Sequence, residues 1–127
     1  SISPDEILTS ISLPAMNGAG AAYEKHRHPA SGYAVVGVAA VVKVEGGTIT
    51  AASVAVTGAT AKAEHAAATE SALVGQPATA ETIKSAAAKA AEGLEVNGDV
   101  YASAEYRSHL ITVLAKRAIA KAAGVSL

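Results

Sequence analysis

Cysteine is absent from this chain of 127 residues. Without thiols the protein forms no disulfide, thiolate zinc site, iron–sulfur cluster or cysteine nucleophile. Any iron–sulfur centre that works with this protein must therefore lie elsewhere. The absence also fits a reducing compartment, and we expect a cytoplasmic location.

Aromatic residues and net charge are scarce too. The chain has four tyrosines, no phenylalanine and no tryptophan, and its formal net charge is -1. Proteins that bind nucleic acid need a basic field, or aromatic side chains interleaved with basic ones for base stacking. Neither pattern is present, so we expect no nucleic-acid partner, and the core must be built from alanine and aliphatic side chains.

Long apolar runs are also missing. The longest, residues 33–42, is far shorter than the ~20 residues that cross a bilayer, so we expect no membrane insertion. Hydrophobic residues make up 50% of the chain and charged residues 17%, which indicates a chain that folds, and the length fits a single domain over residues 1–127. The start, with Pro4 and Asp5 and no initiating methionine, suggests a domain boundary or else a processed N-terminus.

A strand is predicted near the N-terminus, over residues 7–13. Ile7, Ile11 and Leu13 share one parity there, as the alternation of a half-buried strand requires, and Pro14 ends the pattern. This strand would open the first of two blocks, an extended block over about residues 6–58.

The remaining strands of this block are expected at residues 21–27, 35–44 and 48–57, which are rich in β-branched residues or bounded by turn signals. The Glu45-Gly46-Gly47 sequence is a hairpin signal, because glycine reaches positive φ without steric cost. We therefore expect an antiparallel sheet of three to four strands.

Helical signals dominate the second block, over about residues 63–124. Alanine-rich stretches at 64–73 and 81–92 have high helix propensity, and Thr79 is a candidate N-cap for the second. The longest helix follows Ser103, another candidate N-cap. A sheet followed by a bundle of about three helices indicates an α+β fold.

One side of the longest helix is predicted to face the core. Its apolar residues at helical spacing are Tyr106, Leu110, Val113, Leu114 and Ala118. These side chains should pack on the sheet or on the other helices.

Several motifs, taken in order along the chain, carry a family resemblance. They are a tyrosine–x–lysine stretch at 23–25 followed by a small-residue strand at 32–40, an acidic–x–x–Leu–x–Gly–x–Pro segment at 70–77, and Asp99 followed by the segment 103–110. In this order and spacing the chain resembles the C-terminal domain of the FAD-binding medium subunit of the carbon monoxide dehydrogenase and xanthine dehydrogenase family of molybdenum hydroxylases. It departs from the family pattern between Val56 and Ala61, where it has only Gly58 and no proline.

The resemblance implies a CO dehydrogenase flavoprotein C-terminal domain-like fold in an oxidoreductase subunit. FAD would be held mainly by two preceding domains, and this domain would cover the flavin and contribute to contacts with an iron–sulfur small subunit and a molybdenum large subunit. Gly18-Ala19-Gly20 lacks the strand-to-helix unit of a phosphate-binding loop, so we expect the isolated chain to hold no cofactor and to be inactive.

Tyr23 and Lys25 are the candidate cofactor-binding residues that the resemblance implies. A cation near the flavin N1 and C2 carbonyl would stabilise the reduced form. The alternatives are a solvated lysine on an edge strand and a tyrosine that serves the core.

Other reactive side chains carry weaker hypotheses. His26 and His28 alternate and could share a strand face, but no third ligand stands at matched spacing, so we predict no metal site. Asp99 and Arg107 are expected to form a structural pair rather than a catalytic one.

No catalytic residue is predicted, and the substrate of the parent enzyme stays open. A freestanding α+β binding or assembly module, with alanine-rich helices packed on a partner and no redox role, is the alternative function.

Overall fold

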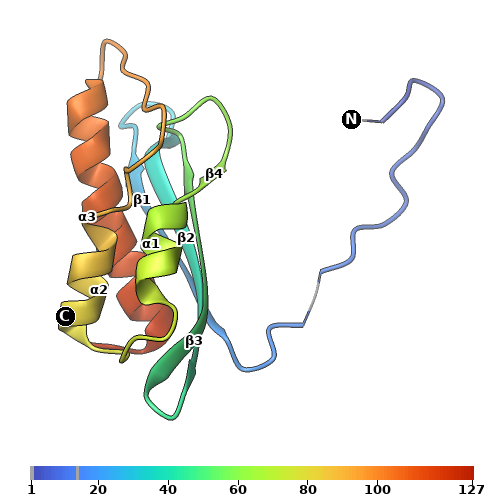
Figure 1. Cartoon of the computed structure of the whole chain (residues 1–127). Helices are drawn as coiled ribbons and strands as arrows, with labels where there is room; N and C mark the ends of the chain where they lie inside the picture. The colour runs from blue at the N-terminus through green and yellow to red at the C-terminus, as the bar shows by residue number, and fades with distance from the viewer. Residues whose placement is uncertain (1, 14) are drawn as a thin grey trace.

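The structure is a computed structural model that describes residues 2–13 and 15–127. Within these residues it has four strands and three helices: β1 (Gly20–Arg27), β2 (Ala34–Glu45), β3 (Thr48–Thr57), β4 (Glu64–His65), α1 (Ala67–Leu73), α2 (Ala80–Ala87) and α3 (Ala104–Ala123). The strands pair antiparallel in the order β1-β2-β3-β4, and the helices cover one face of the sheet (Figure 1). The predicted α+β fold is confirmed.

The hairpin between β2 and β3 forms where the glycine pair predicted it. Gly46 and Gly47 have φ values of 56° and 79°, so both occupy the left-handed region that a two-residue hairpin turn requires. Strands β2 and β3 then pair along most of their length. Together they are the centre of the sheet.

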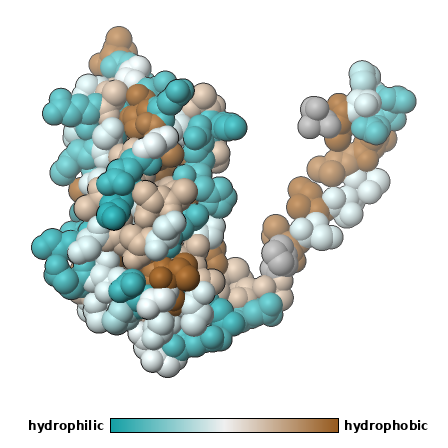
Figure 2. Space-filling model, in the orientation of Figure 1, coloured by the Kyte–Doolittle hydropathy of each residue, from teal (hydrophilic) through white to brown (hydrophobic). Residues whose placement is uncertain are grey.

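The prediction of a strand over residues 7–13 is wrong. In the described part of this segment the chain is extended without ladder pairing and runs away from the body of the molecule (Figure 1). Its large apolar side chains stay exposed, from 62% at Leu8 to 86% at Ile7 and Leu13, and Figure 2 shows them standing clear of the body. The alternation of apolar and polar residues indicates that one set of side chains favours burial, but it does not identify the surface that would bury them.

The core lies between the sheet and the helices and contains no aromatic side chain among the described residues. Val36, Val38, Val54 and Val56 are fully buried on the sheet side, and Ile111 is fully buried on α3. Since small side chains fill this interface, the α3 backbone approaches the sheet closely, and a Cβ at Gly20 would overlap the carbonyl oxygen of Ala122.

The buried face of α3 is rotated from the predicted one. Leu114 and Ala118 are buried as expected, but Tyr106 is 45% exposed, and Leu110 and Val113 are only partly buried. The residues that form the buried stripe instead are Ile111, Leu114, Ala115, Ala118, Ile119 and Ala122. The alanines determine which face of α3 is buried, because their short side chains let the helix backbone approach the sheet closely. The prediction gave more weight to the large side chains.

The helix boundaries differ from prediction at two places. Glu64 and His65 form β4 on the edge of β3, so α1 begins three residues later than expected, and α2 ends at Ala87 rather than near residue 92. Both predicted N-caps are confirmed. The Thr79 hydroxyl accepts from the Thr82 amide, and the Ser103 hydroxyl accepts from the Tyr106 amide.

Candidate functional site

The sheet face opposite the helices carries the two predicted site residues. On β1, Glu24 lies 3.3 Å from the Lys121 ammonium, and the His26 ring faces the Tyr106 ring, so these side chains point towards α3. Successive strand side chains point to opposite faces. Tyr23 and Lys25 therefore share the face that α3 leaves uncovered.

Tyr23 extends over the neighbouring strand rather than into the core. Its side chain reaches the α-carbon of Gly37 on β2, where an added Cβ would overlap the tyrosine hydroxyl and lie 2.9 Å from ring Cζ and 3.0 Å from Thr57 Cγ2. Half of Tyr23 is exposed. Glycine at position 37 makes room for a surface tyrosine that packs against the sheet.

Lys25 lies next to Tyr23 on the same face and is held at its charged end. Its ammonium group donates to the carbonyl oxygen of Gly32 at 3.0 Å. Lys25 is paired with Gly37 in the β1–β2 ladder, and the Tyr23 hydroxyl lies over the same glycine. A fixed cation beside an exposed aromatic ring can contact a planar ligand that gains negative charge.

The turn that holds Lys25 is built on His28. Backbone hydrogen bonds join the His28 amide to the Tyr33 carbonyl (2.8 Å) and the Gly32 amide to the His28 carbonyl (2.9 Å). His28 Nδ1 accepts from the amides of Ala30 and Ser31 at 3.2 and 3.3 Å. The ring also packs edge-on against Tyr101, with centroids 4.3 Å apart.

Asp99 and Arg107 form a pair that joins three parts of the chain. Arg107 is buried and donates to the carbonyls of Val35 at 3.3 Å and Gly58 at 2.7 Å, and to the Asp99 carboxylate. Asp99 accepts from the amides of Tyr101 and Ala102 at 2.9 and 3.0 Å.

These contacts also set the electrostatics of the pair. The amides of Tyr101 and Ala102, together with the Arg107 guanidinium, hold the pKa of the Asp99 carboxyl below its ordinary value. The structural role predicted for the pair fits this geometry, because apart from their contact with each other both side chains bond backbone groups of this chain.

The histidines of the 26–28 stretch do not converge. His26 faces Tyr106 on the helix side, and His28 is engaged with its own turn and with Tyr101. In residues 2–13 and 15–127, no three side chains of metal-ligand type come together. His65 is paired with Glu70 at 2.7 Å, in the separate β4–α1 region.

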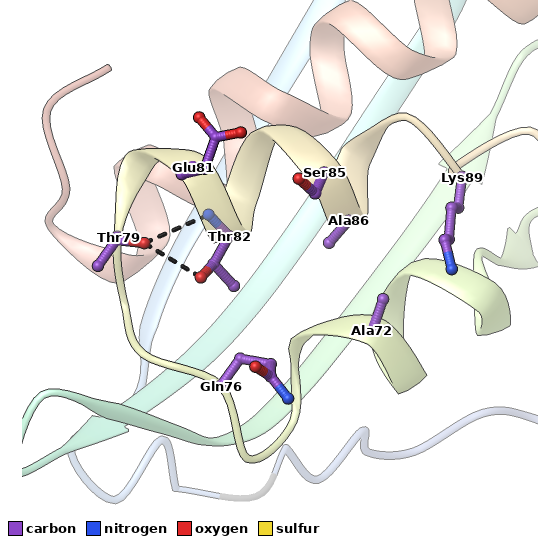
Figure 3. Close-up of a pocket in the computed structure, with 8 residues that line it drawn as sticks. All are labelled: Ala72, Gln76, Thr79, Glu81, Thr82, Ser85, Ala86 and Lys89. Atoms are coloured by element: carbon purple, nitrogen blue, oxygen red, sulfur yellow. Dashed lines mark hydrogen bonds between the residues drawn. The ribbon is translucent and has the colours of Figure 1, made fainter.

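A hollow on the helix side does not include the candidate residues. It is an open depression of about 450 Å³ between α1 and α2, lined in part by Gln76, Thr79, Glu81 and Lys89 (Figure 3). The Thr79 hydroxyl is already used by the cap of α2, Glu81 lies in the first turn of that helix, and Lys89 follows its C-terminal end. The lining therefore offers no converging acid, base or nucleophile.

Three residues that support Tyr23 and Lys25 on the sheet face opposite the helices were not identified from the sequence. Gly37, Gly32 and Tyr101 carry no chemistry of their own, and each acts by making room, supplying a carbonyl or packing a ring. A glycine in the middle of a valine-rich strand was the one signal available, since such a glycine often marks a close approach.

Comparison with known proteins assigns the family. The family model of the CO dehydrogenase flavoprotein C-terminal domain matches residues 21–122. The chain belongs to the CO dehydrogenase flavoprotein C-terminal domain family. The resemblance drawn from the sequence motifs is confirmed, and Tyr23, Lys25, Asp99 and Arg107 all lie inside the matched region.

Relatives of this flavoprotein domain agree with the assignment. The alpha subunit of the 6-hydroxypseudooxynicotine dehydrogenase complex of Paenarthrobacter nicotinovorans is 31% identical over 124 residues, covering 96% of this chain and 42% of that protein. The carbon monoxide dehydrogenase medium chain of Hydrogenophaga pseudoflava is 29% identical over 116 residues, covering 91% and 40%.

A solved structure gives the same fold. The chain superposes on quinoline 2-oxidoreductase from Pseudomonas putida 86 with a TM-score of 0.79 and 31% identity, covering 90% of this chain and 39% of that one. The chain thus spans about two fifths of the length of the relatives it matches. Among the described residues, no helix has both the length and the apolar character needed to span a bilayer.

Proposed function

We propose that this chain is the C-terminal domain of the FAD-binding medium subunit of a molybdenum hydroxylase, and that its open sheet face covers the flavin. The observation that carries the proposal is the pairing of Tyr23 and Lys25 on the uncovered face of β1. One is a half-exposed aromatic ring, and the other is a cation two residues along the same strand face, held by the Gly32 carbonyl.

The chemistry of these two residues fits a flavin ring. When bound, FAD accepts electrons and gains negative charge on the N1 and C2 carbonyl side of its isoalloxazine. The Lys25 ammonium donates one of its three N–H groups to the Gly32 carbonyl, so two N–H groups remain for a negatively charged part of the flavin. The Tyr23 ring offers an aromatic face or edge for stacking.

The residues present fit the ring of FAD but not its diphosphate. A diphosphate is held by a glycine-rich loop that leads into a helix N-terminus. Gly46 and Gly47 are used in a hairpin turn, and the N-caps of α1 and α2 are Ala66 and Thr79, which do not close such a loop. We propose that other domains of the same subunit hold the phosphates.

The N-terminal segment supports contact with those domains. Residues 2–13 expose five large apolar side chains, a pattern that marks interaction surfaces. We propose that this segment packs against the FAD-binding domains of the subunit, and that the subunit assembles with an iron–sulfur small subunit and a molybdenum large subunit in the cytoplasm. Electrons would pass from molybdenum through the iron–sulfur clusters to FAD.

Titration with FAD, followed by flavin fluorescence, tests the proposal. The chain alone should bind FAD weakly or not at all, since it lacks the diphosphate site. The whole subunit should bind tightly, and removal of this domain should leave a flavin that iodide quenches more strongly. Saturable binding by the isolated chain at low micromolar FAD would refute the proposal that other domains hold the diphosphate. Unchanged iodide quenching after removal of the domain would instead favour an assembly module without a flavin contact.

A further inference from the structure

We infer that Arg107, Asp99 and Tyr101 are positioning residues that fix the turn at residues 28–32 and, through it, the ammonium group of Lys25. The inference rests on the proposed function for its consequence at the flavin. Its structural part concerns contacts within this chain and can be tested without a cofactor.

Arg107 is the fixed end of the arrangement. Its guanidinium lies below the surface, and it binds the carbonyl oxygens of Val35, at the start of β2, and Gly58, just after β3. A planar guanidinium that engages several acceptors has little orientational freedom. The group is therefore fixed at one end of the β2–β3 pair.

Asp99 transmits this position to a surface loop. One carboxylate oxygen accepts from Arg107, and the other accepts from the amides of Tyr101 and Ala102. The Asp99 amide in turn donates to the Ala102 carbonyl at 3.0 Å, which closes the loop. The backbone of Tyr101 is thus held by a charged group whose own partner is buried.

Tyr101 connects the loop to the Lys25 turn. Its side chain is 70% exposed, so its ring is not needed to fill the core. The ring packs edge-on against His28, at 4.3 Å between centroids. His28 organises the turn by its ring Nδ1, and the turn presents the Gly32 carbonyl to Lys25. Without Tyr101, nothing else in the described chain packs an aromatic ring on His28.

Amide hydrogen exchange of the 127-residue chain tests the structural part. An edge-on aromatic pair is worth a small free energy, so Tyr101→Ala should speed exchange at the His28 and Gly32 amides by about 2- to 10-fold. Tyr101→Phe keeps the ring and should match the parent. Val100→Ala, at the adjacent and 95% exposed position, is the matched control and should also match it.

Two results would overturn the inference at this stage. One is exchange at His28 and Gly32 that is unchanged in Tyr101→Ala. The other is Tyr101→Phe exchanging as fast as Tyr101→Ala, which would assign the effect to the hydroxyl rather than to ring packing. The Val54 amide, bound by Glu70 at 2.7 Å in a distant part of the sheet, reports whether the fold as a whole has loosened.

The flavin potential of the whole subunit tests the functional part. Tyr101→Ala should shift the midpoint potential in the same direction as Lys25→Ala but by less, and should add nothing in the Lys25→Ala background. Equal shifts in both backgrounds would refute action through Lys25. If Lys25→Ala itself leaves the potential unchanged, the flavin role of Lys25 fails, and the exchange experiment alone decides whether Tyr101 positions the turn.

Discussion

Replacing Arg107 should be among the most destabilising single changes in this chain. The side chain is 8% exposed and reaches two backbone carbonyls, one at the start of β2 and one just after β3. Removal of the guanidinium leaves the carbonyl of buried Val35 without its donor, which costs about 1–3 kcal/mol. The Gly58 carbonyl is nearer the surface, where water can replace the lost donor, and Asp99 remains solvated.

The apolar stem of Arg107 adds a second contribution. Truncation to alanine also removes two buried methylenes, at ~0.8 kcal/mol each, and leaves a void. We therefore expect Arg107→Ala to lower the free energy of unfolding by about 3–5 kcal/mol, from the unpaired Val35 carbonyl and the lost methylenes together. The buried Nε has no partner among the described residues, which favours the lower end.

Urea unfolding followed by circular dichroism measures this loss, and a matched variant separates its two parts. Arg107→Met fills most of the same volume without donors, so it should retain the stem contribution and lose about 1–3 kcal/mol. A loss below about 1 kcal/mol for Arg107→Ala, with an unchanged m-value, would refute the reasoning. Equal losses for both variants would show that packing of the stem contributes nothing.

Three further predictions concern stability and the open face. Leu114→Ala should cost about 2–5 kcal/mol, whereas Leu110→Ala should cost less because that side chain is only partly buried; equal shifts in thermal unfolding would mean that the buried face of α3 is misplaced. Because the pKa of Asp99 is lowered on folding, its stabilisation is present above pH ~4 and lost as the pH falls through the folded-state pKa; the stability difference between the parent and Asp99→Asn should shrink in acid, and a pH-independent difference would contradict this. Gly37→Ala should displace the Tyr23 ring from β2 while changing stability by less than about 1 kcal/mol, since that ring is half exposed and can rotate outwards; unaltered nuclear Overhauser contacts between the ring and residue 37 would argue against the overlap.

The sheet and the caps could be predicted because their signals are local. The glycine pair at 46–47 and the β-branched runs beside it fix a hairpin without reference to distant residues. Thr79 and Ser103 likewise act on amides three residues away. In both cases the interacting residues lie within a few positions of one another in the sequence.

The errors concern features whose partners lie far away in the sequence. Ile7 and Leu13 alternate like strand residues, but alternation does not supply a neighbouring strand. The face of α3 depends on which side fits closely against β1 and β2, and alanine spacing mattered more there than the large side chains at Tyr106 and Leu110.

The candidate site also has one part that the sequence predicted and one part that it did not. Tyr23 and Lys25 were chosen from a family pattern, and strand alternation puts them on one face. Their supports, Gly37, Gly32 and Tyr101, are separated from them by up to 78 residues and are joined only by the fold. Apart from the glycine within a valine-rich strand at position 37, no local pattern in the sequence could reveal those contacts.

The central claim is that Lys25 is a flavin-facing cation. Redox titration of the FAD-containing subunit, at fixed pH and salt, compares the parent with Lys25→Ala and Lys25→Arg. We expect Lys25→Ala to lower the flavin midpoint potential by tens of millivolts at most, since ~30 mV corresponds to about 1.4 kcal/mol for a two-electron couple. Lys25→Arg should keep most of the parent value, because the charge is retained. If Lys25→Ala keeps its FAD and titrates at the parent potential, Lys25 does not face the flavin.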